Sequence, residues 1–208
     1  MINFIRQLLF LHIPKTGGTT IKNHLRTFRG NIPMPIHPHI LDYVNRFPET
    51  LEFFKFCVVR NPWDLVVSRY FYRKQIIENR GNSSQVNNPN ASFTEFVTDE
   101  DLYMESFKTW VNKDSEAFRL YDERKSFGAQ YDLISDGDEN ILMDKILRYE
   151  NFEDEVRELL LSFGISQIRD LHLNKSNHVD YKIYYTDQTR NIIANRFEKD
   201  IDYFKYTF

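Results

Sequence analysis

The stretch FLHIPKTGGTTIKNHL, Phe10 to Leu25, decides the fold that we predict for this chain. The apolar run over Leu8–Ile13 is typical of a buried strand. Over Thr19–Phe28, apolar residues recur at the spacing of one face of a helix. A lysine, two glycines and three threonines lie at the junction of these two segments. The sequence therefore predicts a strand, a loop and a helix, in that order.

This loop is a candidate anion site. A loop that leaves the carboxyl end of a strand and enters a helix presents main-chain N–H groups and the positive end of the helix dipole. Gly17 and Gly18 let the main chain approach a ligand closely, and Lys15 adds a charge that can reach a phosphate oxygen. The further donors are the hydroxyl groups of Thr16, Thr19 and Thr20. The alternative interpretation is an ordinary glycine turn beside a solvated lysine.

The order of residues disfavours a nucleoside triphosphatase. In such enzymes the lysine follows the glycines and a hydroxyl residue beside it binds magnesium. Here Lys15 precedes Gly17 and Gly18, and no strand that ends in an acidic metal ligand stands out. We therefore expect no metal site.

A second strand, loop and helix follow in CVVRNPWDLVVSRYFY. The strand Phe53–Val59 ends at Arg60, and Asn61-Pro62 supplies an N-cap and a first-turn proline for a helix that extends to about Ile77. Arg60 and Ser68 could hold a second phosphate through the guanidinium fork and the hydroxyl group. The alternative is a capped amphipathic helix after an ordinary arginine. The two loops together indicate one ligand with two separated anionic groups.

The remaining sequence completes an alternating pattern. After the proline-rich stretch NIPMPIHPHI, the pattern predicts a short helix in LDYVNRF, and it predicts an exposed loop over residues 81–90. QYDLISDGDENILMDKILRYE predicts a strand, a turn and a second strand. Two helices follow: Phe152–Phe163, capped by Asn151 and ended by Gly164, and a last one over about 187–203. Strands that alternate with helices favour an α/β fold with a central parallel sheet, and the length favours a single domain over residues 1–208.

Composition excludes several classes of protein. The net charge of −3 and the pI near 6.1 exclude a global basic field, so we expect no nucleic-acid partner. No stretch reaches the roughly 18 apolar residues of a membrane span. The single cysteine, Cys57, lies in an apolar run and is expected to be buried. The N-terminal segment runs directly into the loop and does not read as a leader, which favours a bacterial cytoplasmic protein over a Golgi one.

In these motifs the chain resembles the sulfotransferases, and in particular the branch that contains many carbohydrate sulfotransferases. HIPKTGGTT is similar to the family's 5′-phosphosulfate loop and VVRNPWDLVVSRY to its 3′-phosphate motif. RYENF resembles a stretch whose tyrosine, here Tyr149, lies near the adenine. NKSNH and RFEKDIDYFKY resemble the closing segment of the family. One departure is Leu65, where the helix motif frequently has an arginine.

The resemblance implies a P-loop-like three-layer fold and the donor 3′-phosphoadenosine-5′-phosphosulfate (PAPS). The 5′-phosphosulfate would be held by Lys15, Thr16, Gly17, Gly18, Thr19 and Thr20. Arg60 and Ser68 would hold the 3′-phosphate, and Lys175 and Ser176 lie where the family often has a loop that closes over the nucleotide. Sulfuryl transfer needs the acceptor oxygen, the sulfur and the leaving oxygen in line, and Lys15 is the predicted proton donor at the leaving phosphate.

The acceptor hydroxyl also needs a base, and PIHPHILDYV suggests one. Some uronyl-directed sulfotransferases have a similar pair of histidines before an apolar, aspartate-bearing helix. We expect His39 to be the base, with His37 assisting; the alternatives are exposed histidines or an incomplete metal pair. The expected acceptor is a saccharide or glycolipid, and the oligomeric state is left open. Two other classes remain as alternatives: a P-loop nucleotide-dependent kinase and a catalytically silent nucleotide-binding module.

Overall fold

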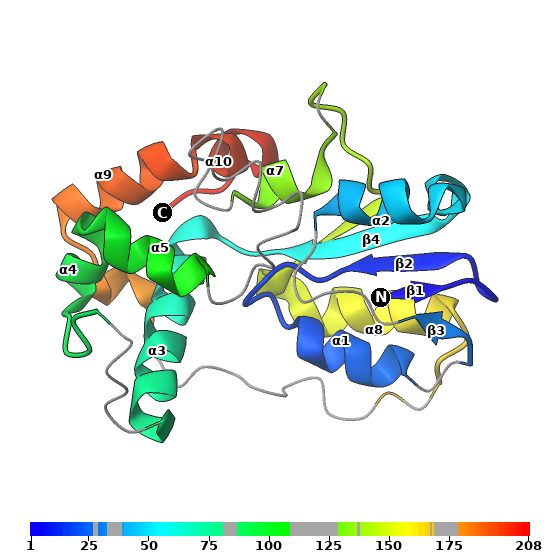
Figure 1. The fold of residues 1–208 in the computed structure, drawn as a ribbon, viewed down its shortest axis with the longest axis horizontal. Helices are drawn as coiled ribbons and strands as arrows, with labels where there is room; N and C mark the ends of the chain where they lie inside the picture. Colours follow the sequence, from blue (N-terminus) through cyan, green and yellow to red (C-terminus); the bar gives the residue numbers. More distant parts are fainter. Residues whose placement is uncertain are drawn as a thin grey trace. The chain divides into compact units, whose positions relative to one another are not determined.

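The computed structural model describes residues 1–26, 29–32, 39–80, 87–108, 129–136, 138–166, 168 and 179–208. The chain divides into two compact units (Figure 1). Unit 1 comprises Met1–Arg60 and Val111–Lys175, and unit 2 comprises Asn61–Trp110 and Ser176–Phe208. The single domain over residues 1–208 stays a prediction. No helix in the described ranges is long and apolar enough to span a membrane.

Unit 1 contains a five-stranded sheet with the order β3-β1-β2-β4-β5. Its strands are β1 (Ile2–Asn3), β2 (Leu8–Leu11), β3 (Asn31–Ile32), β4 (Phe54–Val59) and β5 (Lys145–Arg148). β2 pairs in parallel with β4, and β4 pairs in parallel with β5, whereas β1 is antiparallel to both of its neighbours. The α/β class and the central, mostly parallel sheet are therefore confirmed, with an antiparallel edge added at β1 and β3.

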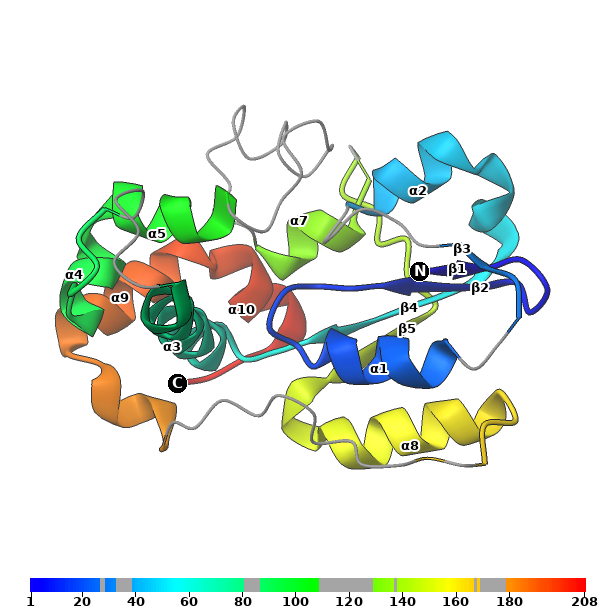
Figure 2. The same ribbon diagram turned by 60° about the horizontal axis from the view of Figure 1, so that its bottom comes forward.

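Helices cover both faces of this sheet. Alternate residues of β2 and β4, such as Phe10 and Phe56, pack with apolar residues of α1 (Gly18–Leu25) and α8 (Phe152–Ser162) in one buried cluster. On the other face lie α2 (Ile40–Arg46), which runs into the 3₁₀ helix η1 (Pro48–Glu52), and α7 (Gln130–Ile134), as Figure 2 shows. Cys57 is fully buried, as its sequence context predicts. Burial on both faces explains why these strands read as continuous apolar runs.

The strand predicted at the start of QYDLIS is wrong. Residues Gln130–Ile134 form the short helix α7, and of the two predicted strands only the second forms, as β5. Between them the described residues contain an isolated bridge, Ser135 to Ile141. A five-residue segment with apolar residues at Tyr131, Leu133 and Ile134 fits either a strand or one turn of helix, so the local pattern does not decide.

Helix α8 begins and ends close to the predicted residues, but one of its predicted caps is wrong. Asn151 precedes the helix without a side-chain capping bond, because the 3₁₀ turn η2 (Tyr149–Asn151) leads into it and the Asn151 amide donates to Glu155. Gly164 ends the helix with φ of 76°, and the N–H groups of Gly164 and Ile165 donate to the carbonyls of Leu161 and Leu160. This pair of bonds is a Schellman motif, and its left-handed residue favours glycine.

Unit 2 is helical. It contains α3 (Pro62–Arg80), α4 (Phe93–Thr98), α5 (Glu100–Lys108), the 3₁₀ helix η3 (Tyr181–Tyr184), α9 (Asp187–Arg196) and α10 (Glu198–Phe204). Asn61 caps α3 as predicted, since its side-chain oxygen accepts from the N–H of Trp63 at 3.1 Å. The single last helix predicted over 187–203 is instead two helices that meet at Phe197.

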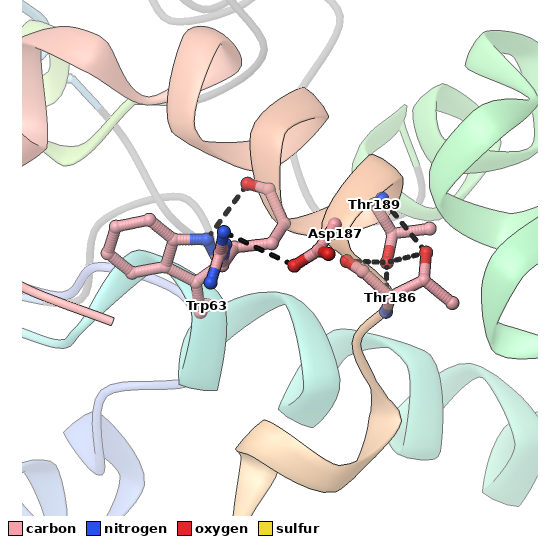
Figure 3. A network of polar contacts seen from close by, with 5 residues as sticks. Trp63, Thr186, Asp187 and Thr189 are labelled. Carbon is pink, nitrogen blue, oxygen red and sulfur yellow. Dashed lines mark hydrogen bonds and ion pairs between the residues drawn. The ribbon is translucent and has the colours of Figure 1, made fainter.

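A polar network joins the first turns of α3 and α9 (Figure 3). The indole N–H of Trp63 donates to the carbonyl of Arg190 at 3.1 Å, and the Arg190 guanidinium lies 3.3 Å from the carboxylate of Asp187. Thr186 caps α9: its hydroxyl accepts from the N–H of Thr189, whose hydroxyl accepts from the N–H of Thr186. These reciprocal bonds satisfy main-chain donors at the start of the helix.

We predict that Thr186→Ala lowers the free energy of unfolding by about 1 kcal/mol, because the cap of α9 is lost. Urea unfolding of the whole chain measures this change. Gln188→Ala is the matched control, since Gln188 is also an exposed residue of the same turn and lies outside the capping pair. Equal stability of the two variants would contradict the importance of the cap.

Candidate functional site

The predicted loop forms at the carboxyl end of β2 and enters α1, within unit 1. Lys15 has a φ of 66° and Gly17 a φ of 78°, so two of its residues are left-handed. Such a conformation is strained for a residue with a side chain, and for lysine it needs support from its neighbours. The loop turns the N-terminal N–H groups of α1 and the positive end of its dipole toward the same strand end.

Gly17 is required for two reasons. Its φ is left-handed, and a Cβ atom at this position would lie 2.5 Å from the ring of Phe152. Phe152 is the first residue of α8 and belongs to the buried cluster under the sheet. The loop is thus pressed against the core, and a side chain at this position would displace it.

Gly18 is required for a different reason. A Cβ atom at Gly18 would overlap the Cδ2 and Nε2 atoms of His12. His12 is buried, and its ring stacks on Phe10 with 6.0 Å between centroids. The imidazole therefore occupies the space that a side chain at position 18 would need.

The three threonines differ in what they offer. The Thr16 hydroxyl is buried and donates to the Ile13 carbonyl at 2.9 Å, so its proton is used to shape the turn. Thr19 is exposed, whereas Thr20 is buried and its N–H donates to the Gly17 carbonyl at 3.0 Å. In this arrangement the exposed hydroxyl of Thr19 remains the best placed of the three for a ligand.

Arg60 lies directly after β4, the strand beside β2. It is 3% exposed, its Nη1 donates to the carbonyl of Lys15 at 3.0 Å, and its guanidinium lies 4.0 Å from the ring centroid of Tyr149. The structure thus brings together Lys15, Arg60 and Tyr149, which the sequence predicts as parts of one site. Stacking on the ring and the hydrogen bond to the loop fix the plane of the guanidinium.

The ammonium group of Lys15 is only partly solvated. Burial, followed by the positive charge of Arg60, lowers the pKa of Lys15 from 10.5 to about 8. The charged form is therefore less favoured than in a solvated lysine, and a bound anion would favour it again. A lysine of this kind holds a positive charge at pH 7 and releases its proton more readily than usual.

Sequence reasoning missed Gln130, the first residue of α7. This residue is fully buried, and its amide forms hydrogen bonds of 2.8 Å to both the N–H and the carbonyl of Arg60. The two residues are 70 positions apart, so no local signal could have linked them. The sequence also gives no signal that Phe152 supports the loop, because the contact of its ring with Gly17 forms only in the fold.

His39, the predicted base, is 1% exposed and caps α2. Its Nδ1 accepts from the N–H of Leu41 at 3.0 Å, and its own N–H donates to the carboxylate of Asp42 at 2.6 Å. A neutral imidazole that accepts at Nδ1 carries its proton on Nε2. In this arrangement neither ring nitrogen is a ready proton acceptor for a substrate.

The remaining predicted residues lie elsewhere. Ser68 belongs to unit 2, where it is buried in α3. Leu65, at which the helix motif departs from the usual arginine, is fully buried in the same helix. His37, Lys175 and Ser176 lie outside the residues that the structure describes. Among the residues that the structure does describe, no group of three or more histidine, cysteine or acidic side chains could hold a metal ion.

Comparison with known proteins identifies the family. The model of the sulfotransferase family matches residues 2–207, nearly the whole chain. The chain belongs to the sulfotransferase family. An uncharacterized protein of Archaeoglobus fulgidus is 27% identical to this sulfotransferase over 128 residues, which are 61% of this chain and 81% of the relative. A crystal structure of a sulfotransferase from Alicyclobacillus acidocaldarius aligns with 97% of this chain and 96% of its own, with 12% identity and a TM-score of 0.44.

For this sulfotransferase we predict that Gly18→Ala lowers the free energy of unfolding by about 1 to 3 kcal/mol, because the new methyl group overlaps the His12 ring. His12→Ala removes that ring, so the double variant should lose at least about 1 kcal/mol less than the sum of the single changes. Urea unfolding of the four proteins gives the coupling.

Gly164→Ala is the control for this cycle, because no atom lies within 4 Å of the position that its Cβ would take. His12→Ala should not relieve the loss at Gly164. Strict additivity of the changes at positions 12 and 18 would show that the imidazole does not set the need for glycine.

Proposed function

We propose that this enzyme transfers the sulfuryl group of PAPS to a hydroxyl group of a saccharide or glycolipid. One observation carries the proposal: Lys15 and Arg60 follow neighbouring parallel strands, and the Arg60 guanidinium donates to the Lys15 carbonyl at 3.0 Å. Two cations beside the N-terminus of α1 form a donor set suited to a ligand with several anionic oxygens.

The residues present fit the donor. The 5′-phosphosulfate would be held by the loop residues Lys15, Thr16, Gly17, Gly18, Thr19 and Thr20, with the exposed hydroxyl of Thr19 as a direct donor. Arg60 would hold the 3′-phosphate, and Tyr149, which is partly exposed and already stacks with Arg60, would lie near the adenine. Ser68 is the proposed second ligand of the 3′-phosphate. Lys175 and Ser176 are proposed to close over the nucleotide.

When bound, the donor supplies the sulfuryl group and a phosphate leaving group. Lys15 would hold its proton at the bridging oxygen, where negative charge grows as the sulfur–oxygen bond breaks. Burial and the charge of Arg60 lower the Lys15 pKa in the protein alone, and the phosphate oxygens of the bound donor would favour the charged form again, so Lys15 would carry its proton in the complex. The main-chain N–H groups of the loop would hold the phosphate oxygens without rearrangement.

A histidine is the proposed base for the acceptor hydroxyl, His39 with assistance from His37. For His39 this role requires the hydrogen bond between its Nδ1 and the N–H of Leu41 to open. Saccharide acceptors, the cytoplasmic location and the bacterial source remain proposals from the sequence.

We predict that 3′-phosphoadenosine-5′-phosphate, the donor product, binds without metal at pH 7 and that Lys15→Met weakens binding about 10- to 100-fold. Isothermal titration calorimetry measures both affinities. Lys22→Met is the control, since Lys22 lies on α1 beyond the loop. Magnesium-dependent binding of adenosine triphosphate, with no binding of the product, would instead favour the kinase alternative.

We predict that the affinity for the same product falls as the pH rises through about 8. Below this pH Lys15 is charged and attracts the anion. Above it Lys15 has lost that charge in the protein without ligand, so the affinity falls by up to about tenfold per pH unit. Titration calorimetry from pH 7 to pH 9.5 tests this dependence, which should be absent in Lys15→Met. An unchanged affinity across this range would contradict the assignment of Lys15 to the anion.

We predict that His39→Asn separates the two roles of His39. Asparagine is a good N-cap residue but no base, so the variant should keep the stability of α2 and lose at least about 100-fold in sulfuryl transfer. Transfer of labelled sulfate from PAPS to a panel of glycans measures the rate, and His39→Ala serves as the variant that lacks both cap and base. Near wild-type transfer by His39→Asn would assign His39 to capping alone.

A further inference from the structure

The buried amide of Gln130 forms hydrogen bonds with the main chain of Arg60, the residue that follows β4. β4 pairs with β2 up to Cys57 and with β5 up to Val59, so the parallel ladder ends before Arg60. A buried main-chain N–H or carbonyl without a hydrogen bond is costly. Gln130 accepts from the N–H of Arg60 and donates to its carbonyl, both at 2.8 Å.

These two bonds act as one additional rung of a sheet. A residue in a strand pair exchanges an N–H and a carbonyl bond with its partner, and the glutamine amide offers the same donor and acceptor in one side chain. Gln130 is fully buried and Arg60 is 3% exposed, so water does not compete for these bonds. The main chain of Arg60 is therefore fixed where it leaves the sheet.

Because the main chain of Arg60 is fixed, its side chain starts from a fixed position. From there its guanidinium reaches the Lys15 carbonyl at 3.0 Å and stacks 4.0 Å from the Tyr149 ring centroid. Lys15 has a left-handed φ of 66° and needs such a neighbour to hold it. Gln130 thus contacts Arg60, and Arg60 contacts Lys15, so the position of Lys15 depends on Arg60 and that of Arg60 on Gln130.

We propose that Gln130 is a positioning residue of this enzyme: it holds the main chain of Arg60, and through the Arg60 guanidinium it sets the conformation of Lys15 and the surroundings of its ammonium group. Gln130 itself touches neither substrate nor reacting atoms. The consequence for sulfuryl transfer rests on the proposed function, whereas the hold on Lys15 is a property of the protein without ligand.

The test is the titration of Lys15 in Gln130→Met, which keeps the length of the side chain and removes both hydrogen bonds. Lysines labelled by reductive ¹³C-methylation are followed by nuclear magnetic resonance, and Lys15→Arg assigns the signal of Lys15. Once Arg60 is released, burial and the neighbouring charge both weaken, so the Lys15 pKa should rise from about 8 toward 10.5. The affinity for 3′-phosphoadenosine-5′-phosphate should fall at least about tenfold.

Ile134→Val is the matched control. Ile134 is fully buried in the same short helix, and its truncation loosens α7 while Gln130 remains. The control should lose stability without a change in the Lys15 titration or in product affinity. Should Gln130→Met not fold, Gln130→Asn replaces it, because its shorter amide cannot reach both main-chain atoms of Arg60.

The outcomes separate the inference from the proposed function. A shifted Lys15 titration in the Gln130 variant, together with a wild-type protein that does not bind the product, supports the hold on Lys15 and refutes the proposed donor. A Lys15 titration identical to that of the wild type, even in a destabilised variant, would overturn the inference and leave Gln130 a structural residue only.

Discussion

The hydrogen bond from Arg60 to the Lys15 carbonyl is the interaction on which the candidate site depends. Lys15 adopts a left-handed conformation that costs a residue with a side chain about 1 to 3 kcal/mol, so the loop needs a stabilising contact with a residue outside it. Arg60 supplies this contact, and it is in turn fixed by the Tyr149 ring and the Gln130 amide. Segments far apart in the sequence therefore meet at one guanidinium group.

The same contact sets the electrostatics of the loop. The charge of Arg60 adds to the effect of burial in lowering the Lys15 pKa, so the two cations oppose each other in the protein alone. An anion bound beside them would offset both effects. Because the cations follow neighbouring strands that pair in one sheet, little reorganisation would accompany binding, which is the condition under which fixed charges contribute most to catalysis.

Local sequence patterns predict the parts of this fold whose signals lie within a few residues. Apolar runs predict β2 and β4, and the Asn61-Pro62 pair and Gly164 predict one end each of α3 and α8. The strand predicted in place of α7 is wrong because a five-residue apolar segment fits both structures. Gln130 escapes prediction because its partner is 70 residues away, and His12 because its contact with Gly18 exists only once the loop has folded back.

His39 illustrates how a local structural need can resemble a catalytic signal. The pattern of a histidine followed three residues later by Asp42 is also the spacing of a capping box, and the structure contains that box, with bonds of 3.0 Å and 2.6 Å. Histidine is not among the residues preferred at this position, so capping alone gives a weak reason for its presence. The bond to Leu41 fixes the proton on Nε2. Any role in proton abstraction therefore begins with the release of Nδ1 from the helix, and that step would couple the first turn of α2 to the chemistry.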